Sequence, residues 1–147
     1  MENQEKYCAT SLESLVDYGT SKFGRNVTVL TTEILGDKGQ RTRMRKLQQG
    51  VRKIVSDNFL PCHSLPYLYA VFYCHATLAH IAQPYIVPLV GADGMKIIAT
   101  AVCHKDTSKW NPDHVAFRVL NVEPGTVPIC HFLTEDNIGW AAENKNN

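Results

Sequence analysis

The sequence predicts an α+β fold that is mainly antiparallel β-sheet, with one helix near the N-terminus and disulfides that staple the strands. Three observations predict it. A helical pattern is confined to residues 11–22, short apolar or alternating runs follow one another from residue 67 onward, and four of the five cysteines stand beside a histidine. A length of 147 residues, with 44% hydrophobic and 20% charged residues, is typical of a single domain, here 1–147.

The helix is predicted from its start signal and its apolar spacing. Residues 10–13 (TSLE) have the spacing of a capping box, and apolar side chains recur at helical intervals from Leu12 to Tyr18. Gly19 and Gly24 are expected to end the pattern, which places the helix at 11–22. The β-branched run 26–34 (NVTVLTTEI) then predicts a strand, and the glycine-containing segment 36–39 leads into a charged loop.

The later strands are predicted from short runs that turn residues separate. Residues 91–94 (GADG) are a hairpin turn between two of these runs, and residues 123–125 (EPG) are another turn. Residues 143–147 form a polar tail. The predicted strands are 67–75, 85–90, 95–104, 114–122 and 127–132.

Charge and hydropathy argue against two classes of partner. A net charge of +1 gives no bulk attraction to nucleic acid or to an anionic membrane. The basic stretch from Lys38 to Lys53 lacks interleaved aromatic residues and is typical of a solvated loop. No apolar run approaches the ~18 to 20 residues of a membrane span, and residues 1–15 lack the features of a signal peptide. We therefore expect no nucleic-acid partner, no membrane partner and no signal peptide in this chain.

Four Cys-His dipeptides dominate the sequence. Neighbouring side chains of a strand point to opposite faces, so a dipeptide on a strand sends its sulfur one way and its imidazole the other. In the run 67–75 the sulfur shares the apolar face, whereas both faces of the run 95–104 are fairly apolar. Nearby prolines make regular alternation doubtful at the first and last dipeptides. The dipeptides are Cys62-His63, Cys74-His75, Cys103-His104 and Cys130-His131.

The sulfurs and the imidazoles suit different uses. Structural zinc usually takes closely spaced cysteine pairs, and no CxxC occurs here. Four cysteines can instead form two disulfides, in any of three connectivities. Imidazole suits copper, and oxidised sulfur cannot reduce a copper ion as a free thiolate can. The alternative is that the histidines are hydrogen-bonded strand residues and the cysteines small core hydrophobes.

The spacing of the dipeptides resembles a family signature. Ten residues lie between the first and second dipeptides, 27 between the second and third and 25 between the third and fourth, and eight separate His131 from Trp140. This resembles the plant BURP domain, whose signature is four CH dipeptides followed by a tryptophan. Between Lys6 and Trp140, other segments are similar to that family: KYCATSLESLVDYG, VFYCH, VPLVGADG, AVCHKDTSKWNPDHVAF and PGTVPICHFL.

The resemblance implies one of two functions. Some BURP proteins are copper-dependent peptide cyclases, in which dioxygen-dependent chemistry links a tyrosine or tryptophan side chain to another residue of a core peptide. Others are noncatalytic seed, stress-response or cell-wall proteins, so a cell-wall polysaccharide or enzyme is the alternative partner. The resemblance implies that the catalytic and copper-binding residues are His63, His75, His104 and His131, with His114 as a further copper ligand.

The remaining expectations concern the cysteines and the start of the chain. By the alternation argument and their even count, two disulfides are expected among Cys62, Cys74, Cys103 and Cys130. Family BURP domains extend upstream of KYCATSLE and provide a partner for Cys8, so the resemblance implies that the front of the domain is missing here. Family members are secreted or vacuolar/apoplastic. A core peptide would be a separate substrate of this chain, or the chain would be part of a longer precursor that contains the peptide. His80 is interpreted as a surface or core residue.

Overall fold

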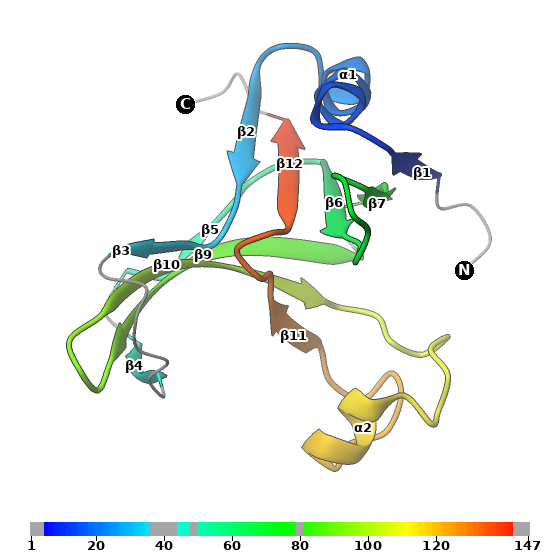
Figure 1. Ribbon diagram of the computed structural model, residues 1–147. Coiled ribbons are helices and arrows are strands. Elements are labelled where there is room, and N and C mark those ends of the chain that lie inside the picture. The colour runs from blue at the N-terminus through cyan, green and yellow to red at the C-terminus, as the bar shows by residue number, and fades with distance from the viewer. Residues whose placement is uncertain (1–4, 36–43, 48–49, 79–80, 143–147) are drawn as a thin grey trace.

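The structure, a computed structural model, describes residues 5–35, 44–47, 50–78 and 81–142. Within them, the strands form two six-stranded sheets in which all pairs are antiparallel. The strands of one sheet run steeply across those of the other, and the helix α1 lies beside the first sheet (Figure 1). The predicted antiparallel fold with an N-terminal helix and disulfides is confirmed, although helix is a small part of it.

The first sheet contains the first two Cys-His dipeptides. Its strands follow the order β1-β7-β6-β12-β2, and β8 pairs with β6. Their bounds are β1 (Lys6–Ala9), β7 (Phe72–His75), β6 (Asn58–Ser64), β12 (Ile138–Ala142), β2 (Val27–Leu30) and β8 (Thr77–Leu78).

The second sheet contains the other two dipeptides. Its strands follow the order β11-β10-β9-β4, while β3 pairs with β10 and β5 with β9. Their bounds are β11 (Ile129–Phe132), β10 (Lys96–His104), β9 (Ala82–Gly91), β4 (Met44–Leu47), β3 (Glu33–Leu35) and β5 (Arg52–Lys53).

Helix α1 (Leu12–Phe23) confirms the predicted helix with a shift of one residue. Its capping box is formed by Ser11 and Ser14, one residue later than the TSLE pattern indicates. Gly19 does not end the helix. It faces the core, where a Cβ would lie 2.7 Å from the Trp140 ring, so close packing explains the glycine at this position. The helix ends at Gly24, whose φ of 74° favours glycine.

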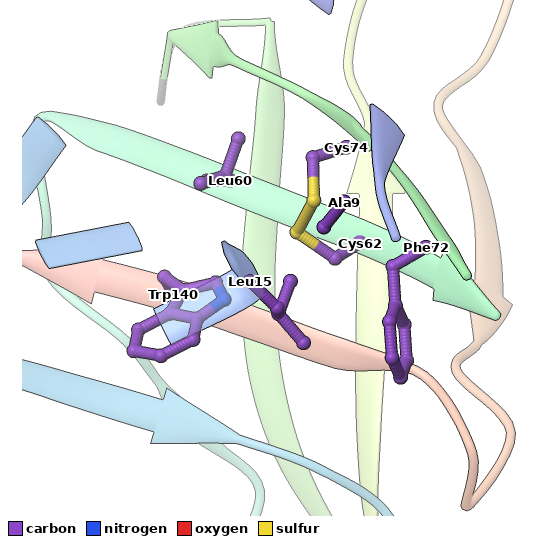
Figure 2. Close-up of a cluster of buried hydrophobic side chains, with 7 residues drawn as sticks. All are labelled: Ala9, Leu15, Leu60, Cys62, Phe72, Cys74 and Trp140. Atoms are coloured by element: carbon purple, nitrogen blue, oxygen red, sulfur yellow. A yellow bond between two sulfur atoms is a disulfide. The ribbon is translucent and has the colours of Figure 1, made fainter. Parts of the chain in front are cut away.

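Two main clusters of buried side chains hold the layers together. The first packs α1 against the outer face of the first sheet and includes a disulfide (Figure 2): Ala9, Leu15, Leu60, Cys62, Phe72, Cys74 and Trp140. The second joins the inner faces of the two sheets: Leu30, Ile54, Phe59, Ala82, Val102, Leu133 and Ala141. A smaller cluster lies on the other face of the second sheet: Val87, Leu89, Ala99 and Ala101.

The predicted strand at 114–122 is wrong, because this segment contains helix α2 (Val115–Leu120). The side chain of His114 caps its start, and Asn121 ends it in the left-handed conformation with a φ of 53°. Phe117 is its only buried residue. A helix of six residues with one buried side chain shows too little periodicity to outweigh the β-branched composition of the segment.

Two other strand predictions are correct only in part. The run 67–75 is a strand only over β7, because the backbone N–H of Leu65 donates to the carbonyl of Val71 and closes a loop. The run 26–34 divides into β2 and β3, which belong to different sheets. The hydroxyl of Thr32 donates to the carbonyl of Leu133, and that of Thr100 donates to the carbonyl of Thr31. These hydrogen bonds hold the chain where it passes from one sheet to the other.

The expected basic loop lies partly outside the described residues, which omit 36–43 and 48–49. Its described part contains two strands that sequence analysis did not predict, β4 and β5. Arg52 and Lys53 are exposed, as expected for a solvated segment. The tail 143–147 also lies outside the described residues. In the part of the chain that is described, neither helix is long and apolar enough to span a membrane.

Candidate metal centre formed by two histidine pairs

The first histidine pair comes from β6 and β7. These strands place Cys62 directly opposite Cys74, with the Cα atoms 4.0 Å apart and the sulfurs bonded. His63 and His75 follow the cysteines, so both imidazoles lie on the other face of the sheet. Their Nε2 atoms are 3.2 Å apart, and their rings stack with centroids 5.3 Å apart.

The second pair repeats this arrangement on β10 and β11. Cys103 lies directly opposite Cys130, again with a Cα separation of 4.0 Å and a disulfide bond. The Nε2 atoms of His104 and His131 are 3.3 Å apart on the other face. The expected two disulfides are thus confirmed, and the register selects one of the three connectivities.

Strand alternation holds at all four dipeptides, including those near prolines. Pro61 lies inside β6, a central strand, where proline is unusual. On one side of β6, β8 pairs with residues 58–59 and β7 with residues 62–64, so Pro61 falls in the gap between them. On that side Pro61 has no strand partner, so the hydrogen that its nitrogen lacks removes no hydrogen bond between strands. Pro128 precedes β11 and leaves that strand regular.

Both pairs lie on the faces that the two sheets turn toward each other. His63 shares its face of β6 with Phe59, and His104 shares its face of β10 with Val102; both apolar residues belong to the core between the sheets. Burial lowers the pKa of His63, and the charge of His131 lowers it further. Members of the two pairs therefore interact electrostatically at the rim of this core, although each pair is a separate set of two ligands.

The two more buried histidines are neutral at physiological pH. Burial lowers the pKa of His75 to about 4, and the charge of His63 adds to the effect. Burial likewise lowers the pKa of His104 to about 4, with the charge of His131 adding to it. Neutral imidazole is the form that binds metal ions.

Hydrogen bonds partly define which nitrogen is free. Nδ1 of His131 lies 3.3 Å from the carbonyl oxygen of Phe132, which can only accept, so Nδ1 donates and Nε2 keeps its lone pair. Nδ1 of His75 is buried and lacks a hydrogen-bond partner among the described residues. Two nitrogens that each lie about 2 Å from one ion are roughly 2.8 to 4 Å apart, depending on the angle between them. The Nε2 separations of 3.2 and 3.3 Å fit this range.

Each pair supplies two ligands and no more. Among the described residues, no group of three or more histidine, cysteine, aspartate or glutamate side chains is placed to hold one ion. A metal ion bound by either pair therefore keeps open positions for water or for another small molecule.

Known proteins similar to this chain identify its family. The family model described as "BURP domain" matches residues 1–142. This chain belongs to the BURP domain family. It is 48% identical over 138 residues to BURP domain protein RD22 of Arabidopsis thaliana, covering 93% of this chain and 35% of that protein. It is 44% identical over 142 residues to BURP domain-containing protein 3 of Oryza sativa subsp. japonica, covering 95% of this chain and 33% of that protein. The chain thus spans about a third of the length of these relatives.

The fifth candidate ligand of this BURP domain lies beside the second pair but does not join it. Nδ1 of His114 accepts a hydrogen bond of 3.2 Å from the backbone N–H of Ala116 and caps α2. Its ring centroid lies 5.0 Å from that of Trp110, whose ring lies 5.0 Å from that of His104. Trp110 therefore has ring contacts with both histidines.

The aromatic neighbours of the two pairs are not predicted by the sequence patterns. Tyr73 precedes a dipeptide, and its ring centroid lies 6.0 Å from that of His75. Trp110 follows His104 by six residues, and only the turn residues between them indicate that the chain can fold back.

The two other candidates are outside the pairs. Cys8 is an exposed free thiol on β1, where it lies opposite Tyr73. His80 lies outside the described residues.

Lowering the pH from 7 should destabilise the metal-free protein. The pKa values of His75 and His104 are about 4 in the folded protein and near the ordinary 6.5 in the unfolded chain, so the unfolded state binds more protons between these values. The stability that the neutral rings contribute is full above about pH 6.5 and is lost as the pH falls toward about 4. Urea unfolding across this range measures the effect.

A double variant, His75→Gln with His104→Gln, is the control for that pH dependence. It should show a weaker loss of unfolding free energy between about pH 6.5 and pH 5, because two of the titrating groups are gone. Equal pH dependence in the variant and the unmodified protein would refute the assignment of these neutral rings.

The two disulfides should differ in their reaction with a thiol reductant. Cys62 and Cys74 are fully buried, whereas Cys130 is exposed and Cys103 half-buried. Thiol attack requires access to a sulfur, so Cys103–Cys130 should be reduced first. Stepwise reduction, alkylation and peptide mass mapping measure the order, with Cys8 as the thiol that is labelled without reductant. Simultaneous labelling of all four half-cystines would contradict the difference in burial.

Proposed function

We propose that this BURP domain binds copper through its two histidine pairs and is an oxidative peptide cyclase. The reaction would join a tyrosine or tryptophan side chain to another residue of a peptide substrate, with dioxygen as the oxidant. The observation that carries the proposal is the pairing itself: Nε2 separations of 3.2 and 3.3 Å in two pairs that interact electrostatically.

The ligand chemistry supports copper for these pairs. Divalent copper has the highest affinity in the divalent first-row series for nitrogen ligands, and imidazole suits it. His75 and His104 are neutral at physiological pH, so each needs at most a change of tautomer, and no loss of a charge-bearing proton, before Nε2 can bind a metal ion. Four of the five cysteines are held in disulfides on the opposite faces of the sheets, where they cannot compete as thiolates.

The protein's own residues have separate parts in this proposal. His63, His75, His104 and His131 would hold the ions as the copper-binding and catalytic residues. Nδ1 of His114 already accepts the N-cap hydrogen bond, so we propose that His114 lies outside the ligand set. Copper would supply one-electron oxidation, and dioxygen would take up the electrons and protons that the peptide loses as the new bond forms.

The surroundings of the pairs support an aromatic peptide substrate. Tyr73 lies beside the first pair and Trp110 beside the second, so each pair adjoins an aromatic ring against which a tyrosine or tryptophan can pack. Disulfides persist in oxidising compartments, which supports a secreted or vacuolar protein. The peptide would be bound from solution or supplied by another part of a longer precursor.

Copper content tests the binding part of the proposal. The oxidised protein, reconstituted with Cu²⁺ and freed of excess metal, should retain about two ions per chain, one for each pair. His75→Ala and His104→Ala should each lose about one ion, and His114→Ala should retain both. Elemental analysis with circular dichroism as a check of folding gives the answer. Unchanged copper in the His75 and His104 variants would exclude the pairs as the site.

Mass spectrometry tests the catalytic part. The copper-loaded protein, incubated with a tyrosine- or tryptophan-containing peptide and dioxygen, should produce a peptide lighter by two hydrogen atoms and resistant to linear sequencing. Omission of dioxygen and the His75→Ala variant should both abolish the product. A copper-loaded protein that leaves a panel of such peptides unchanged would favour a noncatalytic BURP protein.

A further inference from the structure

Trp110 lies against one histidine of the second pair. Its ring meets that of His104 edge to face, with centroids 5.0 Å apart and planes at 67°. The ring of His131 stacks with the same imidazole, with centroids 5.4 Å apart and planes at 19°. The imidazole of His104 is therefore in contact with two rings in different orientations.

The position of Trp110 is itself fixed by the loop and helix behind it. Its backbone N–H donates to the carbonyl of Thr107 at 3.0 Å. Thr107 is fully buried, and its hydroxyl accepts a hydrogen bond of 2.9 Å from the backbone N–H of Gly125. The buried ring of Phe117 on α2 lies 6.0 Å from that of Trp110. The backbone of Trp110 is thus anchored at Thr107, and its indole lies against α2.

The two histidines of this pair are oriented in different ways. Nδ1 of His131 is hydrogen-bonded to the carbonyl of Phe132, which fixes its ring. For His104, the only hydrogen-bond partner among the described residues is His131. The torsion angle χ2 of histidine, which sets the plane of the ring, is broadly distributed. A ring that no protein group holds by an outer hydrogen bond therefore depends on packing for a fixed plane. Trp110 is the side chain that provides this packing.

We propose that Trp110 is a positioning residue for the second histidine pair: its indole fixes the imidazole plane of His104 so that Nε2 faces Nε2 of His131. Ligating histidines are usually oriented by an outer hydrogen bond; no described residue provides one to Nδ1 of His104, and packing against the indole orients the ring. The consequence for copper rests on the proposed function, whereas the consequence for ring order does not.

Copper affinity measured one pair at a time tests the consequence for the metal site. In a His63→Ala, His75→Ala background only the second pair remains, and Trp110→Ala should weaken Cu²⁺ binding there by about 10- to 100-fold. Trp110→Phe should keep the affinity within a few-fold, because a ring still packs on His104. In a His104→Ala, His131→Ala background, Trp110→Ala should leave the first pair unchanged. Equal loss at both pairs would mean general unfolding and would overturn the proposal.

Ring order in the metal-free protein provides the second readout. ¹³C relaxation at the Cε1 position should show a lower order parameter for His104 in Trp110→Ala, no change in Trp110→Phe, and no change for His75 in either variant. Val119→Ala, an exposed substitution on α2, is the control and should change neither ring. If neither pair binds copper, the proposed function fails, and the order parameter still decides the role of Trp110. An unchanged order parameter for His104 in Trp110→Ala would refute that role.

Discussion

The register between directly opposed cysteines is the constraint on which the site depends. Each disulfide joins residues that face each other across two antiparallel strands, so the pairing cannot slip by one residue while the bond exists. A slip of one residue would turn every side chain to the other face. Because a histidine follows each cysteine, the same register that joins two sulfurs brings two imidazoles together on the opposite face. Each disulfide also stabilises the domain by roughly 2 to 4 kcal/mol.

The packing of the two sheets places both pairs at the rim of the core between them. Phe59 and Val102 fill the core between the inner faces, and the histidines continue those faces at its rim. The burial that results lowers the pKa values of three of the four histidines and keeps them neutral. His131, on the edge strand β11, is exposed, which leaves the second pair open to solvent. On the opposite faces, α1 packs over the first disulfide, whereas the second is accessible.

Local patterns predicted much of this structure, and long-range pairing accounts for the rest. The predicted helix 11–22, the strand 95–104 and the set of disulfide cysteines depend on short-range signals, and each is confirmed. The connectivity could not be predicted, because the sequence patterns do not show which strands pair or in which register. The division of 26–34 between two sheets depends on hydrogen bonds from Thr32 and Thr100 to distant segments. Helix α2 was missed because it is short, and the contact of Trp110 with His104 depends on that helix.

Mapping the disulfides of the native protein tests this account most directly. A digest under non-reducing conditions, with free thiols blocked beforehand, should contain the peptide pairs joined by Cys62–Cys74 and by Cys103–Cys130, with Cys8 blocked. These two links place the histidines of each pair on one face, as the account requires. Links between the two sheets, such as Cys62–Cys103, or free thiols at the four dipeptides would contradict it, because the register that brings the imidazoles together would then be absent.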